Sequence, residues 1–568
     1  MPADPTYIAD WYGRLLSSRA NWDNVWRDLA DYLTPNKSGI ISQRTQGTKT
    51  TDKIFDGTGM RSLKRLSANL HGSMTSSSIK WFTLRMRDEN LNRLKNVAVW
   101  LEDCVNRMLN AFNQSNFGSE GQELYVDMGA FGTGSLFVEE NEPTEDGKFG
   151  GLRFTALPIG SYVIDEDPYG NVNTIMRCIK MTPKNIVTRF PEAVLPDKIK
   201  EDAEKNKVDL LEVIHAIYPR EGGVSTLDAD AKKLKYASVY ILFSKKILLS
   251  ESGFHEFPAP TPRWSKMSGE AWGRGPGHEA IPDVKTLNRA VELTLKAWAK
   301  AIDPPLLAEN DGITGGVIRL NPAGITYVRD SEKSLRPLAL GSRWDVIKLE
   351  TEDLKQAIRE AFFVDQLSLK DSPQMTAEEV RARIEQMQKM LGPTLGRIES
   401  EFLNPLIQRV FNLMFRANAL LPAPAEIIQA MGTNSGDIDV EYTGPLAKNQ
   451  RIGEVYAIQK AYEVAFSIAQ SKAGLPSVDD VFDSDEALRH AALTLGVPEK
   501  VIRDARTVMQ IRQDRAEEMA QQAQVEQDRV SAGTVKDLAT AREKIGYRPG
   551  IQAPDEETAA LLAAGGGA

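Results

Sequence analysis

One stretch of the sequence decides the fold, because it joins a polar loop to a recognisable N-terminal capping signal of a helix. It reads Leu367-Ser368-Leu369-Lys370-Asp371-Ser372-Pro373-Gln374-Met375-Thr376-Ala377-Glu378-Glu379-Val380. Thr376 and Glu379 are three residues apart and form a capping box, in which each side chain bonds a backbone N–H group at the start of a helix. Apolar residues then recur at helical spacing as far as Phe402, and an amphipathic stripe containing Leu354 and Ile358 precedes the loop. We therefore predict a loop held by a helix at each end, with a tip that projects.

The length and composition indicate a folded protein with more than one domain or lobe. The chain has 568 residues, which exceeds what one hydrophobic core usually supports. Hydrophobic residues make up 42% of the chain and charged residues 26%, and both values are ordinary for a soluble protein. No apolar run approaches the roughly 20 residues of a transmembrane helix, and residues 1–10 lack the basic-then-apolar pattern of a secretion signal. We expect neither membrane insertion nor secretion.

The net charge and the cysteines restrict the possible functions further. A net charge of −9 argues against a protein that clamps DNA through a broadly basic surface. An acidic or neutral wall that repels phosphates suits a conduit through which DNA passes. Cys104 and Cys178 do not form a C-x-x-C pair, and we interpret both as small buried hydrophobic residues in a reducing compartment.

Helical periodicity dominates the chain and is interrupted by one β-rich region. Short alternating runs separated by turn clusters predict strands between about residues 134 and 250, and a further strand covers 80–86. A polar segment, 36–53, reads as a long surface loop. The predicted helices cover 7–33, 59–74, 96–113, 118–130, 196–206, 281–302, 345–363, 375 to about 418, 450–473 and 484–495.

The segment from Glu499 to about Lys544 is a highly charged helix with only a thin apolar set. That set comprises Ile511, Met519, Ala523 and Val530. Such a helix cannot form a thick core alone, so it suits a side-by-side bundle with copies of itself. A single solvated helix is the alternative that periodicity leaves open. The last 20 or so residues have the composition of a disordered tail.

No motif demands catalysis, a cofactor or a metal. The chain lacks G-x-x-x-x-G-K-[ST], and the glycine-rich run Gly273–Gly277 precedes a helix without phosphate-gripping residues, so we interpret it as a bend. Asp165–Gly170 resembles the start of a calcium loop, but Met176 occupies the position of the bidentate Glu, which favours a hairpin turn. The histidines are scattered without metal-ligand spacing, which favours structural or surface roles: His71, His215, His255, His278 and His490. The absence of catalytic and metal-binding motifs favours a structural protein over an enzyme.

Several short motifs occur together in a specific order between about residues 8 and 425. They are Trp22-x-x-x-Trp26 with Tyr32-Leu33-Thr34-Pro35, Asp56-Gly57-Thr58, Trp81-Phe82, Ser115-Asn116-Phe117, Phe131-Gly132-Thr133-Gly134, Gly273-Arg274-Gly275-Pro276-Gly277, Pro304-Pro305, Met375-Thr376-Ala377-Glu378-Glu379-Val380 and Leu391-Gly392-Pro393. Each is weak alone. In this order and spacing, the chain resembles the portal, or head-to-tail connecting, proteins of short-tailed bacteriophages.

The resemblance implies an α+β, predominantly helical, portal-type subunit with a wing, stem, clip and crown, and a possible C-terminal helical barrel. The wing would cover 1–280, with its β-rich part at about 134–250, and the long helix 375–425 would return to it. The remaining assignments are 281–302 and 345–363 for the stem helices, 303–344 for the clip, 364–374 for the tunnel loop, 426–498 for the crown, 499–545 for the barrel helix and 546–568 for the disordered tail.

The same resemblance implies a non-enzymatic role in the virion, after assembly in the host cytoplasm. Roughly twelve copies would form a ring at one capsid vertex, through which double-stranded DNA is packaged and ejected. The implied partners are the major capsid or scaffolding proteins, terminase, tail adaptor proteins and the passing DNA, without a membrane, a metal or a cofactor. The alternatives are a DNA-packaging nuclease or ATPase and an internal scaffolding protein.

Laid on this sequence, the resemblance places several polar residues at the channel wall. The candidates are Lys348, Lys355, Arg359, Ser368, Lys370 and Asp371, with Thr376 and Glu379 capping the base of the loop. Glu352 lies four residues after Lys348 and three before Lys355, so both lysines have a helical partner of opposite charge. The alternative to contact with DNA is therefore that these side chains are solvated or paired along their own helix.

Overall fold

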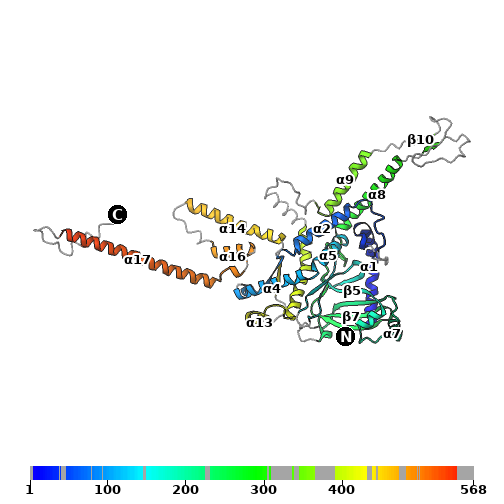
Figure 1. The fold of residues 1–568 in the computed structure, drawn as a ribbon, viewed down its shortest axis with the longest axis horizontal. Helices are drawn as coiled ribbons and strands as arrows, with labels where there is room; N and C mark the ends of the chain where they lie inside the picture. Colours follow the sequence, from blue (N-terminus) through cyan, green and yellow to red (C-terminus); the bar gives the residue numbers. More distant parts are fainter. Residues whose placement is uncertain are drawn as a thin grey trace. The chain divides into compact units, whose positions relative to one another are not determined.

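A computed structural model describes most of the chain, which divides into two compact units, Met1–Gly496 and Val497–Ala568. The described part excludes residues 1–3, 38, 40–46, 79, 93, 145–148, 224–229, 303–305, 309–334, 338–343, 365–390, 432–437, 443–444, 472–481, 496, 498 and 546–568. Most of the strands lie between Leu136 and Phe254, with most of the helices before and after them, in agreement with the predicted α+β class (Figure 1).

The first unit is built around a group of helices that bury aromatic side chains. They are α1 (Pro5–Leu33), α2 (Thr58–Met74), α3 (Glu89–Asn92), α4 (Lys95–Gln114) and α5 (Phe117–Phe131). The start of α1 is fixed by Asp4, whose side chain accepts a hydrogen bond of 2.9 Å from the N–H group of Thr6. The end of α5 is fixed by Gly132, whose φ of 77° is the left-handed conformation that favours glycine. The positions of α1, α2, α4 and α5 agree with the predicted helices within two residues, whereas the short helix α3 was not predicted.

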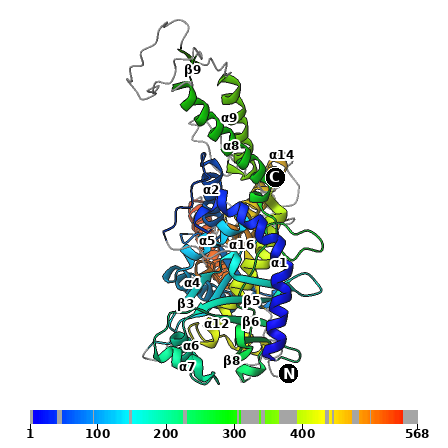
Figure 2. The same cartoon turned by 90° about the vertical axis from the view of Figure 1, so that its right-hand side faces the viewer.

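A five-stranded antiparallel sheet forms the second part of this unit. Its strands are hydrogen-bonded in sequence order: β4 (Tyr162–Glu166), β5 (Val172–Met181), β6 (Leu211–Pro219), β7 (Tyr236–Leu242) and β8 (Ile247–Phe254). The first half of α1 covers one face, because Ile8 and Tyr12 pack with Ile214. The short helices α6 (Pro183–Arg189) and α7 (Asp197–Glu204) cover the other face beside Val213 and Leu242. Figure 2 shows α1 running along the sheet.

Smaller antiparallel pairs complete the β structure. β2 (Leu136–Glu140) pairs with β3 (Leu152–Ala156), and β9 (Leu306–Ala308) with β10 (Leu335–Pro337) within the segment predicted as the clip. The pair of β1 (Phe82–Met86) and β11 (Ile438–Tyr442) joins segments far apart in the sequence. The predicted crown segment therefore contributes a strand to the same sheet as a strand of the predicted wing.

Two helices form a hairpin at the centre of the chain. They are α8 (Pro276–Ile302) and α9 (Trp344–Ala361), which pack against each other. The helix α8 begins five residues before the predicted start and includes Pro282, whose ring removes one helical hydrogen bond without ending the helix. The second helix agrees with its prediction within two residues.

The helix that follows the loop ends earlier than predicted. Residues 391–398 are helical, Glu399–Leu403 form a π-helical turn, and α12 covers Asn404–Arg416. The helix ends two residues before the predicted 418, and the predicted helix 375–425 is wrong for its last nine residues, because Asn418 takes a positive φ of 52°. The π turn ends two residues before Pro405, and both a π turn and a proline are common causes of a kink in a helix.

The remaining helices are α13 (Ala425–Met431), α14 (Pro445–Ser471) and α16 (Ser484–Leu495) in the first unit and α17 (Ala505–Ile545) in the second. The helix α17 is 41 residues long and starts six residues after the predicted Glu499, because Glu499–Val501 form a 3₁₀ turn. The predicted tail, 546–568, lies outside the described residues.

Candidate functional site

The hairpin α8–α9 extends from a buried base to a more exposed outer part (Figure 2). At its base, Val284 and Leu287 of α8 and Ile358 of α9 are buried in the main hydrophobic core. Two turns further along α8, Leu293 is 49% exposed, and Ile302 at the end of the helix is 84% exposed. The core therefore holds the base of the hairpin, whereas the outer part leaves apolar side chains uncovered in a single copy.

Asn288 fixes the base of the hairpin to the loop that precedes α2. Its side-chain oxygen accepts hydrogen bonds from the N–H groups of Phe55 (2.7 Å) and Asp56 (2.9 Å), and its amide donates to the carbonyl of Val284 (2.8 Å). Asp56 in turn accepts a hydrogen bond of 2.7 Å from the N–H group of Thr58 at the start of α2. Because Asn288 is buried, loss of its side chain would leave two backbone N–H groups without a partner.

Ion pairs surround this base. Lys285 of α8 lies 2.5 Å from Asp28 of α1, and Lys53 of the loop lies 2.6 Å from Asp31. Further out on α8, Glu292 lies between Arg289 (2.7 Å) and Lys296 (2.5 Å). The cations of α8 that form these pairs are therefore neutralised within the chain.

The predicted channel residues of α9 share one face of the helix. Lys348, Lys355 and Arg359 are spaced by seven and four residues, which places them on one stripe. Lys355 forms the predicted ion pair with Glu352 at 2.8 Å, and this hydrogen bond lowers the pKa of the Glu352 carboxyl. Arg359 is half-buried, and the side chain of Lys348 lies outside the described residues.

The other predicted site residues also lie outside the described residues. They are Ser368, Lys370 and Asp371 of the loop and the capping residues Thr376 and Glu379. Their roles remain predictions.

A buried arginine ties the helix after this loop to the sheet. Arg263 donates to Glu401 of the π turn through Nη2 (2.8 Å) and Nε (3.1 Å), and its backbone N–H donates to the same carboxylate (2.9 Å). It also contacts Glu166 of β4 and the carbonyl of Gly170 (2.8 Å). The carboxylates raise the pKa of Arg263 despite its burial, so it stays charged. Sequence reasoning missed this group, because its members are distant in the chain and follow no motif.

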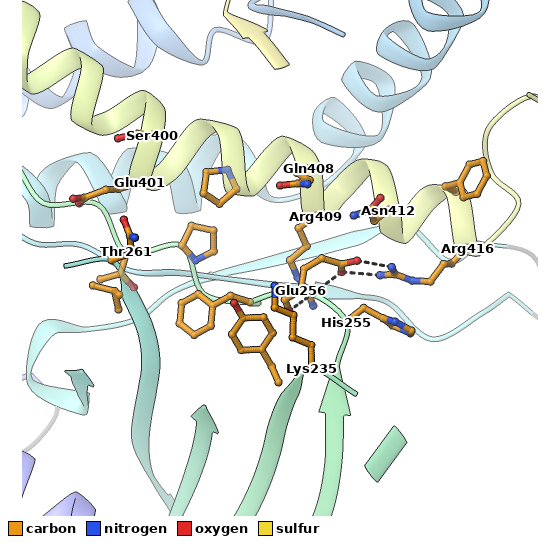
Figure 3. A pocket seen from close by; sticks show the side chains of 17 residues that line it. Lys235, His255, Glu256, Thr261, Ser400, Glu401, Gln408, Arg409, Asn412 and Arg416 are labelled. Carbon is orange, nitrogen blue, oxygen red and sulfur yellow. Dashed lines mark hydrogen bonds and ion pairs between the residues drawn. The ribbon is translucent and has the colours of Figure 1, made fainter. Parts of the chain in front are cut away.

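A cavity of about 490 Å³ lies between α12 and the segment after β8 (Figure 3). Its wall carries Glu256, whose carboxylate accepts two hydrogen bonds from Arg416, at 2.6 and 2.9 Å. Arg409 is buried and donates to the carbonyls of Val138 (3.0 and 2.9 Å) and Glu256 (3.2 Å). Burial lowers the pKa of Arg409 to about 10, which leaves it charged at neutral pH. These charges hold α12 to the sheet region, so we interpret them as structural.

Two of the glycine motifs meet where the chain enters α8. The N–H group of Gly273 donates to the hydroxyl of Thr133 (2.8 Å), and the carbonyl of Gly132 accepts from Trp264 (2.9 Å). A Cβ atom on Gly277 would lie 2.3 Å from the carbonyl oxygen of Ala130, closer than any side chain permits. The bend predicted for Gly273–Gly277 is thus also a close crossing with the end of α5, which sequence reasoning did not foresee.

The histidines and cysteines that the structure describes show structural environments. His215 is buried and stacks on Tyr240 with a centroid distance of 4.0 Å, and burial lowers its pKa well below the ordinary value. Burial also raises the pKa of the Cys104 thiol to about 12 and that of the half-buried Cys178 to about 11. Within the described residues, His, Cys, Asp and Glu do not gather in a group of three or more that could hold a metal ion.

Comparison with known proteins identifies the family. The model of the bacteriophage head to tail connecting protein family matches residues 6–502. The chain belongs to this family. It is 30% identical to the portal protein of Salmonella phage epsilon15, with 90% of this chain and 91% of the relative covered. It is 31% identical to a probable portal protein of Bordetella phage BPP-1, with the same coverage, and 21% identical to the portal protein of Escherichia phage T7, with 74% of this chain and 76% of the relative covered.

The family assignment confirms the function that the sequence motifs predict. This head-to-tail connecting protein is a portal-type component of the virion, and the alternatives of a packaging enzyme or an internal scaffold are not favoured. None of the helices in the described part of the chain combines the length and apolar character needed to cross a membrane. The family match ends before α17, so that helix lies beyond the part that the family model covers.

Proposed function

We propose that copies of this connecting protein form a ring of about twelve subunits at one capsid vertex, with the hairpin α8–α9 lining the channel for double-stranded DNA. One observation supports this arrangement above others: the hairpin is anchored in the core at its base and leaves apolar side chains exposed along its outer part. Neighbouring hairpins in a ring would cover these side chains. A hairpin that acted in a single chain would expose them to water permanently.

The finer assignments follow from this placement. The helices α8 and α9 form the stem, and the segment between them, 303–344, forms the clip that faces terminase during packaging and tail adaptor proteins afterwards. The loop 364–374 forms the narrowest part of the channel. The body with its five-stranded sheet forms the wing, and the segment 426–498 forms the crown. The hydrogen bonds of Asn288 and the ion pairs of Arg263 support a rigid connection between the wing and the two ends of the hairpin–loop segment.

The charge distribution is compatible with a wall that DNA slides past. The chain carries a net charge of −9, and a ring of such chains repels phosphate from most of its surface. Among the predicted channel cations, Lys355 is already paired with Glu352. A wall with few unpaired cations limits the number of phosphates that it can neutralise and therefore limits tight binding.

Electron microscopy of the purified protein and of mature particles tests the ring. The expected result is a closed ring at one vertex, viewed down its axis. If the protein were found only as monomers or dimers at every stage of particle assembly, the proposal would be contradicted.

Deletion of Asp365–Pro373 tests the loop assignment separately. Rings should still form, because the described contacts that anchor the hairpin do not involve these residues, whereas packaging or retention of full-length DNA should fall. The measurement is the DNA content per particle. Normal genome filling in the deletion variant, or loss of the ring itself, would overturn the loop assignment.

A further inference from the structure

Two rows of exposed charges lie on neighbouring helices of the first unit, on α2 and on α9. The basic row on α2 comprises Arg61, Lys64 and Arg65, and the acidic row on α9 comprises Glu350, Asp353 and Glu360. None of the six side chains forms an ion pair with a described residue of the chain. Glu360 accepts one hydrogen bond of 2.9 Å, from the neutral amide of Gln356. Both rows therefore present unneutralised charge to the surroundings.

The basic row works against the stability of its own helix. Arg61 lies three residues before Lys64 and four before Arg65, so like charges are neighbours on the helix surface. Arg61 is also the fourth residue of α2, at the positive end of the helix dipole, where a cation is unfavourable. An anionic partner from outside the chain would offset both costs.

The acidic row also lacks compensation along its own helix. Residues three and four positions away from Asp353 are Leu349, Glu350, Gln356 and Ala357, so no cation lies within reach on α9. Glu352, in contrast, pairs with Lys355 at 2.8 Å on another side of the helix. The helix α9 thus has one side with a matched ion pair and one side with carboxylates that have no cationic partner.

The two rows face away from each other within one chain. The helix α2 packs against α9 near the base of the hairpin (Figure 1). The hydrogen bond from Lys355 lowers the pKa of the Glu352 carboxyl, and the carboxylate of Asp56, just before α2, opposes this shift, so the start of α2 lies on this side of α9. Asp353 is two residues from Lys355 and therefore lies about 160° away around the helix. The acidic row points to the side of α9 opposite α2.

We propose that the basic row of one copy of this chain contacts the acidic row of the neighbouring copy. The proposal rests on the ring described above and specifies two surfaces that meet in it. A head-to-tail interface joins different surfaces of identical chains, and these two rows lie on opposite sides of α9. Complementary charges also determine which surfaces of the two copies meet. Phosphates of DNA would fit the basic row alone and would leave the acidic row without a partner, so the contact between copies is favoured.

Reversal of either row in the full-length protein tests this contact. Arg61→Glu with Arg65→Glu reverses the basic row, and Asp353→Lys with Glu360→Lys reverses the acidic row. Each variant alone should lower the fraction of chains in rings about tenfold or more, because every contact between copies then brings like charges together. The measurement is native mass spectrometry at a fixed protein concentration, with circular dichroism to show that the helical content is unchanged.

A matched control separates the contact from the overall charge of the chain. Lys198→Glu with Lys200→Glu makes the same change in net charge as reversal of the basic row, at exposed lysines of α7. This helix covers the five-stranded sheet and carries neither row. The fraction of control chains in rings should equal that of the unmodified protein.

An equal mixture of the two reversed variants provides the most specific measurement. When the two variants alternate around a ring, the two reversed rows meet at one contact and the two unmodified rows meet at the next. Opposite charges then face each other at every contact, so rings should form again and contain both variants in equal numbers, which their masses distinguish.

If the mixture formed no rings, or if the control lost rings as the row variants do, this inference would be overturned and the proposed ring would stand. Normal rings of the Arg61→Glu, Arg65→Glu variant that bound a DNA duplex more weakly than unmodified rings would also overturn it, and would assign the basic row to DNA. Absence of rings from the unmodified protein would instead overturn the proposed function, and the inference with it.

Discussion

The body of the connecting protein and its hairpin differ in where they obtain their stability. The base of α8 buries Leu287 in the core and is held by hydrogen bonds and ion pairs from other segments of the same chain. The outer part of the same helix leaves Leu293 half exposed and pairs its charges with residues of its own surface. One helix thus passes from contacts within the chain to an apolar surface that the chain itself leaves uncovered, which neighbouring copies would cover in the proposed ring. This change is expected of a subunit that folds alone and functions in a ring.

The largest expected effect is at the glycine crossing in the body. Gly277→Ala should lower the free energy of unfolding by about 3 to 5 kcal/mol, because its Cβ atom would meet the backbone of Ala130 and neither backbone can move cheaply. The matched control is Gly118→Ala in the first turn of α5, where no atom lies within 4 Å of the new Cβ. The measurement is denaturant unfolding of both variants. Equal stability in the two would show that the crossing is looser than the distances indicate.

Two leucines on α8 compare the body and the hairpin within one helix. Leu287→Ala should cost about 3 kcal/mol of unfolding free energy through the cavity that it leaves, whereas Leu293→Ala should cost less than about 1 kcal/mol in the unassembled chain. In assembled rings the difference should shrink, because the ring covers Leu293. Thermal unfolding of unassembled chains and of rings provides the measurement. A difference that persists unchanged in rings would contradict the placement of the hairpin.

Glu401→Gln should lower the unfolding free energy by about 2 to 3 kcal/mol. Removal of this carboxylate leaves the buried Arg263 with Glu166 as its remaining charged partner. The control is Glu399→Gln in the same π turn, where burial raises the pKa of the carboxyl and a neutral amide should therefore be tolerated. If both variants lost the same stability, the π turn rather than the ion pair would be responsible.

The most gradual expected effect, spread between pH 6.5 and 4, is a pH dependence of stability that arises at His278. Burial lowers the pKa of this side chain to about 4, whereas an unfolded histidine titrates near 6.5. The unfolded chain therefore binds the proton more tightly, so His278 contributes stability above pH 6.5 that is lost as the pH falls toward 4, by at most about 1.4 kcal/mol per pH unit.

Asn at this position can still accept the hydrogen bond of 3.1 Å that the N–H group of Gly275 donates to His278. His278→Asn should accordingly flatten the stability curve between pH 6.5 and 4, in denaturant titrations at several pH values. If the free energy of unfolding of the variant changed with pH as steeply as that of the unmodified protein, a group other than His278 would be responsible for the pH dependence.

Sequence reasoning succeeded where the information is local. The periodicity of Val284, Leu287 and Ile358 predicts both helices of the hairpin, and the pair Glu352–Lys355 follows from their spacing alone. It was wrong at the start of α8, where Pro282 is tolerated inside the helix, and at the end of the predicted helix 375–425, where Asn418 has a positive φ. These details depend on the surrounding packing.

The sequence by itself determined the helical and β-rich segments, the ordered motifs and hence the family, because each depends on residues close together in the chain. Only the tertiary structure decided that Arg263 joins Glu166 and Glu401, that β1 pairs with β11, and that Gly277 crosses the end of α5. These contacts join segments that are far apart in sequence, and no local pattern of spacing or charge specifies which of many possible partners comes within reach.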